Sequence, residues 1–95
     1  MKQFYVYIVT NHKRGTLYIG VTSNIAKRAW EHREKVVDGF TKRYGLKRLV
    51  YAEPHVTAED AIRREKRLKN WQRQWKIDLI EQHNPEWRDL YDELI

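Results

Sequence analysis

Two side chains that suit phosphate binding, Arg28 and His32, are spaced about one helical turn apart. They lie in residues 25–37, where apolar residues recur at roughly helical spacing, and they fall along the margin of the apolar face. An arginine beside a histidine, near a helix start that itself attracts anions, suits a phosphate group. The alternative is a boundary arginine that reaches solvent beside a half-buried histidine, and on this pattern alone it is the favoured interpretation.

Glu65 interrupts the apolar stripe of a second predicted helix, residues 58–71. The stripe consists of Ala58, Ala61, Ile62, Leu68 and Trp71. A carboxylate that faces a sheet is unfavourable unless it is paired or holds a metal ion. The pattern leaves a metal site and a buried Glu–Arg pair as equal alternatives.

Tyrosines in two predicted strands, residues 4–10 and 16–21, form the third candidate group. If the polar residues 11–14 form the hairpin loop, Tyr7 lies directly opposite Tyr18 and both project from one face of the sheet. The sequence does not fix this register. Tyrosines are also common in strands where they only pack, so packing remains the alternative.

Other chemistries find no support. The chain has no cysteine, which excludes disulfides, thiolate catalysis and cysteine-bound zinc. There is no glycine-rich phosphate loop and no serine in a nucleophile-elbow context. The histidines lack metal-ligand spacing; they are His12, His32, His55 and His83.

The elements that must position these residues follow from periodicity and from turn residues. Strands are predicted at residues 4–10, 16–21 and 48–53, helices at 25–37, 58–71, 75–83 and 86–94, and a loop or short extended piece at 40–46. Gly20 predicts a bulge or a close backbone approach, and Thr57 with Asp60 predicts an acidic capping box. The order ββαβααα predicts an α+β fold with a small three-stranded, mainly antiparallel sheet flanked by helices, in a single domain over residues 1–95.

The net charge of +6 is unevenly distributed. Residues 1–50 carry 11 Lys and Arg against 3 Asp and Glu, whereas residues 51–95 carry 8 against 10. A basic first half predicts that a polyanion, nucleic acid, docks there. No apolar run is long enough to span a membrane and no signal segment is recognisable, so we expect a cytoplasmic protein.

The three candidate groups resemble, in order, the signature of one family. Tyr5-Val6-Tyr7, followed after ten residues by Tyr18-Ile19-Gly20, is similar to the motif of the GIY-YIG nucleases. Arg28 and His32 fall where that family has a helix arginine and a frequent histidine, and Glu65 matches its metal-binding glutamate. The motif departs at its first two positions, where Tyr5 and Val6 replace glycine and isoleucine, but the functional tyrosine is kept as Tyr7.

The second half resembles the small stand-alone bacterial members of the family. The matching patterns are Ala61-x-x-x-Glu65-x-x-x-Lys69-x-Trp71 and Asn84-Pro85-x-Trp87-x-Asp89-Leu90. The resemblance therefore covers nearly the whole chain and implies the fold of that family.

The resemblance implies a metal-dependent endonuclease that hydrolyses phosphodiester bonds in nucleic acid, with DNA favoured and a structure-specific role in repair or recombination. Glu65 would hold one Mg²⁺ (or Mn²⁺) ion, and Arg28 would bind the scissile phosphate. Tyr7 would orient or deprotonate the attacking water, and Tyr18 would orient water or phosphate. Because tyrosine is a poor base near neutral pH, neighbouring charges would have to lower the pKa of Tyr7, or His32 would accept the proton.

Further residues are expected to contact the nucleic acid. The basic ones are Lys27, Arg33, Lys35, Lys42 and Arg43, and Thr41 or Tyr44 is a candidate for lining the site.

Two rival hypotheses are a non-catalytic nucleic-acid-binding module and a protein-interaction domain that binds a partner, or a second copy of the chain, through its C-terminal segment. The apolar residues of that segment are Trp87, Leu90, Tyr91, Leu94 and Ile95, and packing onto the core is the favoured interpretation for them.

Overall fold

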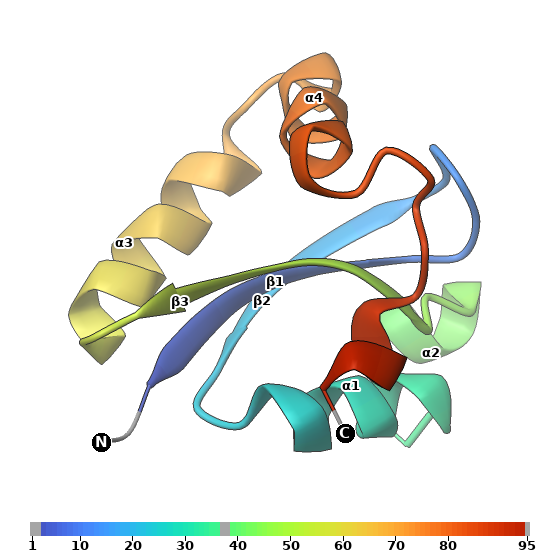
Figure 1. Cartoon of the computed structure of the whole chain (residues 1–95), viewed down its shortest axis with the longest axis horizontal. Coiled ribbons are helices and arrows are strands. Elements are labelled where there is room, and N and C mark those ends of the chain that lie inside the picture. Colours follow the sequence, from blue (N-terminus) through green and yellow to red (C-terminus); the bar gives the residue numbers. More distant parts are fainter. Residues whose placement is uncertain (1–2, 37–38, 95) are drawn as a thin grey trace.

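The computed structural model describes residues 3–36 and 39–94 and contains a three-stranded antiparallel sheet in the order β2-β1-β3 (Figure 1). The strands are β1 (Phe4–Thr10), β2 (Leu17–Thr22) and β3 (Arg48–His55). The helices are α1 (Ile25–Arg33), α2 (Phe40–Tyr44), α3 (Ala58–Lys69), α4 (Arg73–His83) and the short 3₁₀ helix η1 (Leu90–Glu93). The predicted α+β class with a small antiparallel sheet is confirmed.

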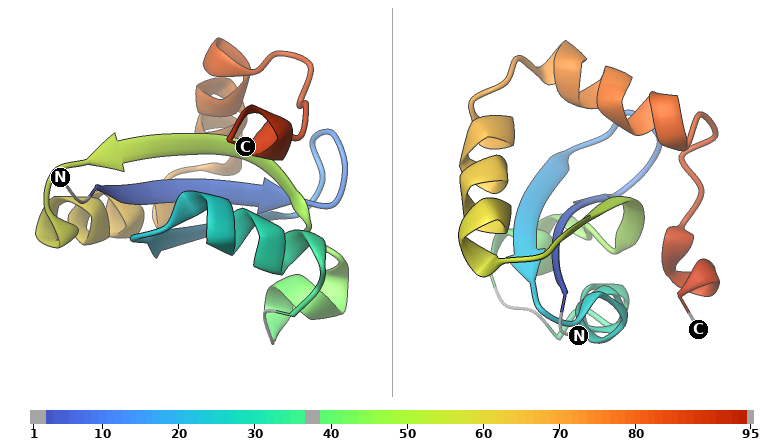
Figure 2. Two further views of the ribbon diagram at one scale, coloured as in Figure 1. Left: turned by 60° about the horizontal axis from the view of Figure 1, so that its bottom comes forward. Right: turned by 60° about the vertical axis from the view of Figure 1, so that its left-hand side comes forward.

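The sheet carries helices on both faces, so its central strand β1 is buried on both sides. On one face, Val6 and Ile8 pack with residues of α3 and α4 such as Leu68 and Ile80. On the other face, Tyr7 and Val9 pack with α1 and with the C-terminal segment (Figure 2). This alternation follows from the period of two along a strand. Tyr7 is therefore fixed on the face that α1 covers.

The strand register differs by two residues from the one considered from the sequence. Tyr7 pairs with Gly20, and Tyr18 pairs with Val9, so the two tyrosines share a face but lie diagonally. The hairpin loop between β1 and β2 is therefore six residues long, residues 11–16, rather than four. The Asn11 side chain closes this loop by accepting a hydrogen bond from the Thr16 backbone N–H at 3.1 Å.

Helix boundaries also differ from the prediction. Residues 40–44 form helix α2 instead of a loop, and the left-handed conformation at Gly45 ends it. Helix α1 ends at Arg33, shortly before Lys35 adopts a positive φ of 58°, whereas the prediction continued to Val37, which lies outside the described residues. Thr57 caps α3 as predicted, its side chain accepting the Asp60 backbone N–H.

Strand β3 continues through Pro54, which was predicted to close it. Proline is tolerated there because β3 is an edge strand, whose outward side needs no ladder hydrogen bond. None of the helices in the described residues is long and apolar enough to cross a bilayer.

The C-terminal segment, residues 84–94, runs along the outer edge of β3 near the start of that strand. The sequence had predicted a helix over residues 86–94. Asn84 donates from Nδ2 to the Val50 carbonyl at 3.2 Å, and Asp89 accepts the Leu49 N–H at 3.2 Å. Trp87 is fully buried at a positive φ of 56°, which a continuous helix would not allow. Within residues 86–94, the helix that the structure does contain is the 3₁₀ helix at residues 90–93.

The remaining apolar residues of this segment pack inward. Leu90, Tyr91 and Leu94 lie against the core on the α1 face, as the packing interpretation expected. Ile95 lies outside the described residues.

We expect Asn84→Ala to destabilise the fold by about 2–3 kcal/mol, because the buried side chain makes three hydrogen bonds, to Val50 and to both backbone groups of Arg88. Urea unfolding followed by circular dichroism measures this change. The matched control is Asn70→Ala, which removes an exposed amide bonded to a single carbonyl of α3. Equal losses in the two variants would contradict a role for Asn84 in covering the strand edge.

Candidate functional site

A buried hydrogen bond joins strand β1 to helix α1 at the centre of the candidate site. The Tyr7 hydroxyl lies 3.0 Å from Nε2 of His32, and the two residues are 3% and 2% exposed. Tyr18 completes the group, with its ring centroid 6.5 Å from that of Tyr7 and 6.1 Å from that of His32. Three of the five predicted catalytic residues therefore lie together.

Gly20 allows this arrangement. A Cβ at position 20 would lie 2.5 Å from the Tyr7 hydroxyl, so the tyrosine ring crosses the strand where the neighbouring residue has no side chain. The close approach predicted for Gly20 is therefore present, with a side chain as the group that approaches.

Both members of the Tyr7–His32 pair are neutral near pH 7. Burial, with a smaller effect of the Arg28 charge, lowers the pKa of His32 from 6.5 to about 4. Burial, reinforced by Tyr18, raises the pKa of Tyr7 above its usual value, and Arg28 only partly opposes this. The expectation that neighbouring charges make Tyr7 acidic is therefore wrong for the protein without bound ligands, because burial outweighs the arginine.

Arg28 lies in the first turn of α1, behind the cap formed by Asn24. Its guanidinium is partly exposed, and its Nε lies 3.4 Å from Glu31 without a hydrogen-bond partner among the described residues. The start of α1 borders a hollow of about 290 Å³, whose lining residues are Thr22, Ser23, Asn24, Lys27, Arg28 and Glu31. A partly exposed arginine that lines a hollow can bind an anion there.

Glu31 was missed by the sequence reasoning. It lies on the same helix, three residues after Arg28, and its charge raises the pKa of both Tyr7 and His32. Its spacing from Arg28 was the signal that could have identified it.

Glu65 lies on α3 and acts on Tyr7 through its charge. Its side chain is 18% exposed, and its charge raises the pKa of Tyr7. Its ion-pair partner is Lys69, at 3.4 Å, rather than the arginine considered from the sequence. In the described part of the chain, no three His, Cys, Asp or Glu side chains cluster as a ready-made metal cage.

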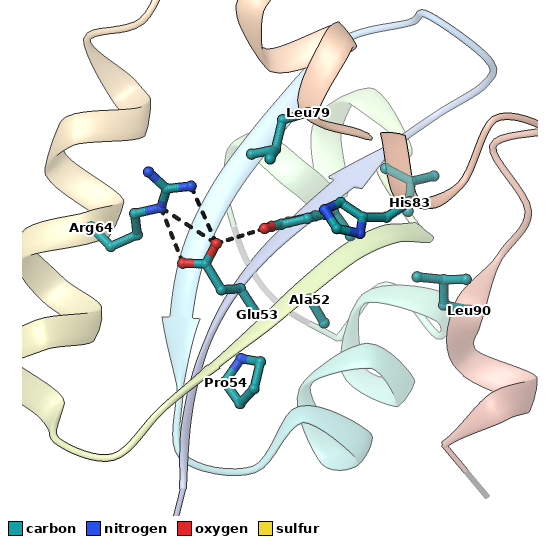
Figure 3. Close-up of a pocket in the computed structure, with 9 residues that line it drawn as sticks. Ala52, Glu53, Pro54, Arg64, Leu79, His83 and Leu90 are labelled. Atoms are coloured by element: carbon teal, nitrogen blue, oxygen red, sulfur yellow. Dashed lines mark hydrogen bonds and ion pairs between the residues drawn. The ribbon is translucent and has the colours of Figure 1, made fainter. Parts of the chain in front are cut away.

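A Glu–Arg pair does form, but it does not include Glu65. Arg64, the residue before Glu65 on α3, pairs with Glu53 of β3 (Figure 3). Burial alone would raise the pKa of Glu53, but hydrogen bonds from Tyr51, His55 and Arg64 outweigh burial and hold the pKa below its usual value. Tyr51, Glu53 and Arg64 border a second hollow, of about 440 Å³, between β3, α3 and α4. Because the polar groups there satisfy one another, we assign this cluster to fold stability.

Exposed aromatic residues extend the site over α2. Phe40 lies 6.5 Å from Tyr18 with nearly parallel rings, and Tyr44 lies 4.7 Å from Phe40. The Arg43 guanidinium lies 5.6 Å from the Tyr44 ring centre. Phe40 was missed because residues 40–46 were expected to form a loop. Thr41 is buried, and its hydroxyl has no hydrogen-bond partner among the described residues.

The predicted backbone-binding residues are not all gathered at this site. Lys27 lines the hollow at the start of α1, and Lys42 and Arg43 belong to α2. Lys35 is exposed just beyond α1. Arg33 instead pairs with Asp92 at 3.4 Å and lies over the Tyr91 ring, so its charge contacts the C-terminal segment.

Comparison with known proteins is consistent over most of the chain. Residues 3–78 match the family model described as the GIY-YIG catalytic domain. The chain is 38% identical to a UPF0213 protein of Staphylococcus saprophyticus, over 84% of this chain and 96% of that protein. It is 37% identical to a UPF0213 protein of Staphylococcus haemolyticus, over 86% and 99%.

A solved structure agrees with the fold. The solution NMR structure of a UPF0213 protein from Bacillus halodurans superposes with a TM-score of 0.57 at 28% identity and covers 92% of both chains. The signature tyrosines, the matched family model and this shared fold all lead to the same assignment: the chain belongs to the GIY-YIG catalytic domain family, a family of nucleases.

Proposed function

We propose that this chain is an endonuclease that hydrolyses phosphodiester bonds in nucleic acid, with DNA favoured, and that it depends on one Mg²⁺ or Mn²⁺ ion. The observation that carries the proposal is the buried, neutral Tyr7–His32 pair, which the charges of both Arg28 and Glu65 reach. A module that only bound nucleic acid would gain nothing from a carboxylate near its phosphate site.

Glu65 is the residue that fits a divalent cation. Its carboxylate is partly accessible and only loosely paired, and Mg²⁺ is commonly held by one carboxylate together with water and substrate phosphate. A cation bound there would supply Lewis-acid stabilisation of the charge that develops on the phosphate and the leaving oxygen.

Arg28 binds the scissile phosphate in this proposal. Its side chain is partly exposed at the start of α1, where helix N–H groups also favour an anion. Charge-assisted hydrogen bonds of this kind strengthen as the phosphate gains negative charge in the transition state. Glu31 holds the arginine in place as a positioning residue.

Tyr7 and His32 together handle the proton of the attacking water. The Tyr7 hydroxyl can donate to Nε2 of neutral His32 if the imidazole proton is on Nδ1. The tyrosine oxygen then accepts the water proton as its own proton moves to Nε2. Bound phosphate favours this step, because a nearby anion stabilises the protonated imidazole. Neither residue has to be charged before substrate arrives.

The aromatic residues and the cations of α2 contact the rest of the substrate. The exposed faces of Phe40 and Tyr44 are suited to stacking on nucleobases, and Lys42 and Arg43 to backbone phosphates. Lys27 and Lys35 extend this basic surface along α1. The proposed pathway remains DNA repair or recombination.

We expect Glu65→Gln and Arg28→Ala each to lower kcat/KM by about 100-fold or more, because single charged groups at such sites contribute about 3 kcal/mol to the transition state. Cleavage is measured on labelled single-stranded, nicked, flapped and branched DNA and on RNA, with Mg²⁺, Mn²⁺ or EDTA. The control is Glu59→Gln, which removes an exposed carboxylate from the same helix α3.

Two results would contradict the proposal. Activity that survives in Glu65→Gln, or that ignores EDTA, would exclude the role of Glu65 as the metal ligand. A parent protein that binds these nucleic acids but cleaves none would favour the binding module.

The low pKa of His32 predicts that stability is lost in acid. An unfolded histidine has a pKa of about 6.5, whereas folded His32 has a pKa of about 4. The unfolded chain therefore binds the proton first, so the free energy of unfolding falls as the pH drops from 6.5 to 4, by on the order of 3 kcal/mol from this group.

Urea unfolding of His32→Gln between pH 4 and 7 checks this prediction. The difference in unfolding free energy between the parent and this variant should shrink as the pH falls. The control is His12→Gln, which replaces an exposed imidazole in the hairpin loop. A parent-minus-variant difference that stays constant across this range would show that His32 is not held neutral.

A further inference from the structure

A lysine next to Glu65 has no role in the proposed function so far. Lys69 lies four residues after Glu65 on α3, and its Nζ is 3.4 Å from Oε2 of the carboxylate. The lysine side chain is 50% exposed, whereas that of Glu65 is 18% exposed. The ammonium therefore approaches the carboxylate from the solvent side, from which a hydrated cation would also enter.

Several basic residues of α3 and α4 have partners other than Glu65. Residues 62–76 contain seven basic residues and one acidic residue, Glu65. Arg63 is paired with Asp60, and Arg64 with Glu53. Arg73 donates to carbonyl groups of the hairpin loop, and Lys76 donates to the Lys69 carbonyl. In the described residues, Lys69 is thus the cation of α3 that is ion-paired with Glu65.

We propose that Lys69 is a substrate-contacting residue that changes partners: it pairs with Glu65 in the free protein and with a backbone phosphate once a divalent cation binds Glu65. This inference rests on the proposed function. The free-protein pair is weak enough to exchange, since solvent-exposed ion pairs contribute about 0–1 kcal/mol.

Electrostatics drives the exchange. A dication on Glu65 and an ammonium about 5 Å away repel each other by roughly 1.7 kcal/mol in water, less with salt. Lys69 is the last residue of α3, and its carbonyl accepts a hydrogen bond from Lys76 at 3.3 Å, so the exchange needs only the side chain to move. The released ammonium can then pair with a backbone phosphate of bound nucleic acid.

The test compares Lys69→Met with Lys66→Met, a matched variant one helical turn earlier whose exposed lysine forms no ion pair within the described residues. Binding of Mn²⁺ is measured first by calorimetry, without nucleic acid. We expect Lys69→Met to bind Mn²⁺ about three- to tenfold more tightly than the parent, and Lys66→Met to stay within twofold. Glu65→Gln serves as the blank that assigns the site.

Binding of a labelled oligonucleotide is then measured with and without Ca²⁺. In the parent, Ca²⁺ should strengthen binding through the released lysine. In Lys69→Met, this gain should be smaller and the slope of log affinity against log salt should fall by about 0.7–0.9. Lys66→Met should keep the gain that Ca²⁺ produces.

The outcomes separate the inference from the proposed function. If Glu65→Gln abolishes cleavage but Lys69→Met binds Mn²⁺ no more tightly than the parent, the exchange is wrong and the nuclease assignment stands. If Lys69→Met shows both expected shifts while the parent cleaves nothing, the exchange stands without catalysis. If the parent binds no Mn²⁺, or Glu65→Gln binds it equally well, the inference is overturned.

Discussion

The buried hydrogen bond between Tyr7 and His32 is the constraint around which the site is organised. Two polar groups are placed between the sheet and α1, where leaving either without a partner would be unfavourable by about 1–3 kcal/mol. Satisfying them fixes the position of α1 over the sheet. Burial keeps both groups neutral, because it lowers the pKa of His32 and raises that of Tyr7, and a neutral pair is what a proton relay needs before substrate arrives.

The rest of the fold keeps this pair in place. Gly20 leaves room for the Tyr7 ring on the neighbouring strand, and β1, which carries Tyr7, is held between two strands and two layers of helices. Because β3 is an edge strand, its outer backbone groups need partners, and Asn84 and Asp89 supply them from the C-terminal segment. A motif far from the site in sequence thereby stabilises the sheet that presents the tyrosine.

The sequence was sufficient to place alternate residues of a strand, such as Tyr5 and Tyr7, on the same side of the sheet, because the period of two follows from strand geometry. It was not sufficient for the register of Tyr18, which goes with a hairpin loop closed by the hydrogen bond that the Asn11 side chain accepts from the Thr16 backbone N–H. It also missed Phe40, since a five-residue helix is too short for periodicity to identify. The sequence left open whether neighbouring charges lower the pKa of Tyr7 or His32 accepts the proton, because the depth of burial that raises this pKa is a property of the tertiary structure.

Two glutamates illustrate how the structure separates a stabilising charge from a functional one. Glu53 accepts hydrogen bonds from a tyrosine, a histidine and an arginine, which leaves its carboxylate no capacity for a further cation. Glu65 is at least as well shielded from solvent, yet its only ion pair within the described residues is a loose contact with a flexible lysine. From sequence both were carboxylates in or near apolar patterns, and α3 carries arginines close to each. Glu65 has only this loose partner within the described residues, and its charge reaches the buried Tyr7. That shortage of partners is the physical reason for proposing the cation at Glu65.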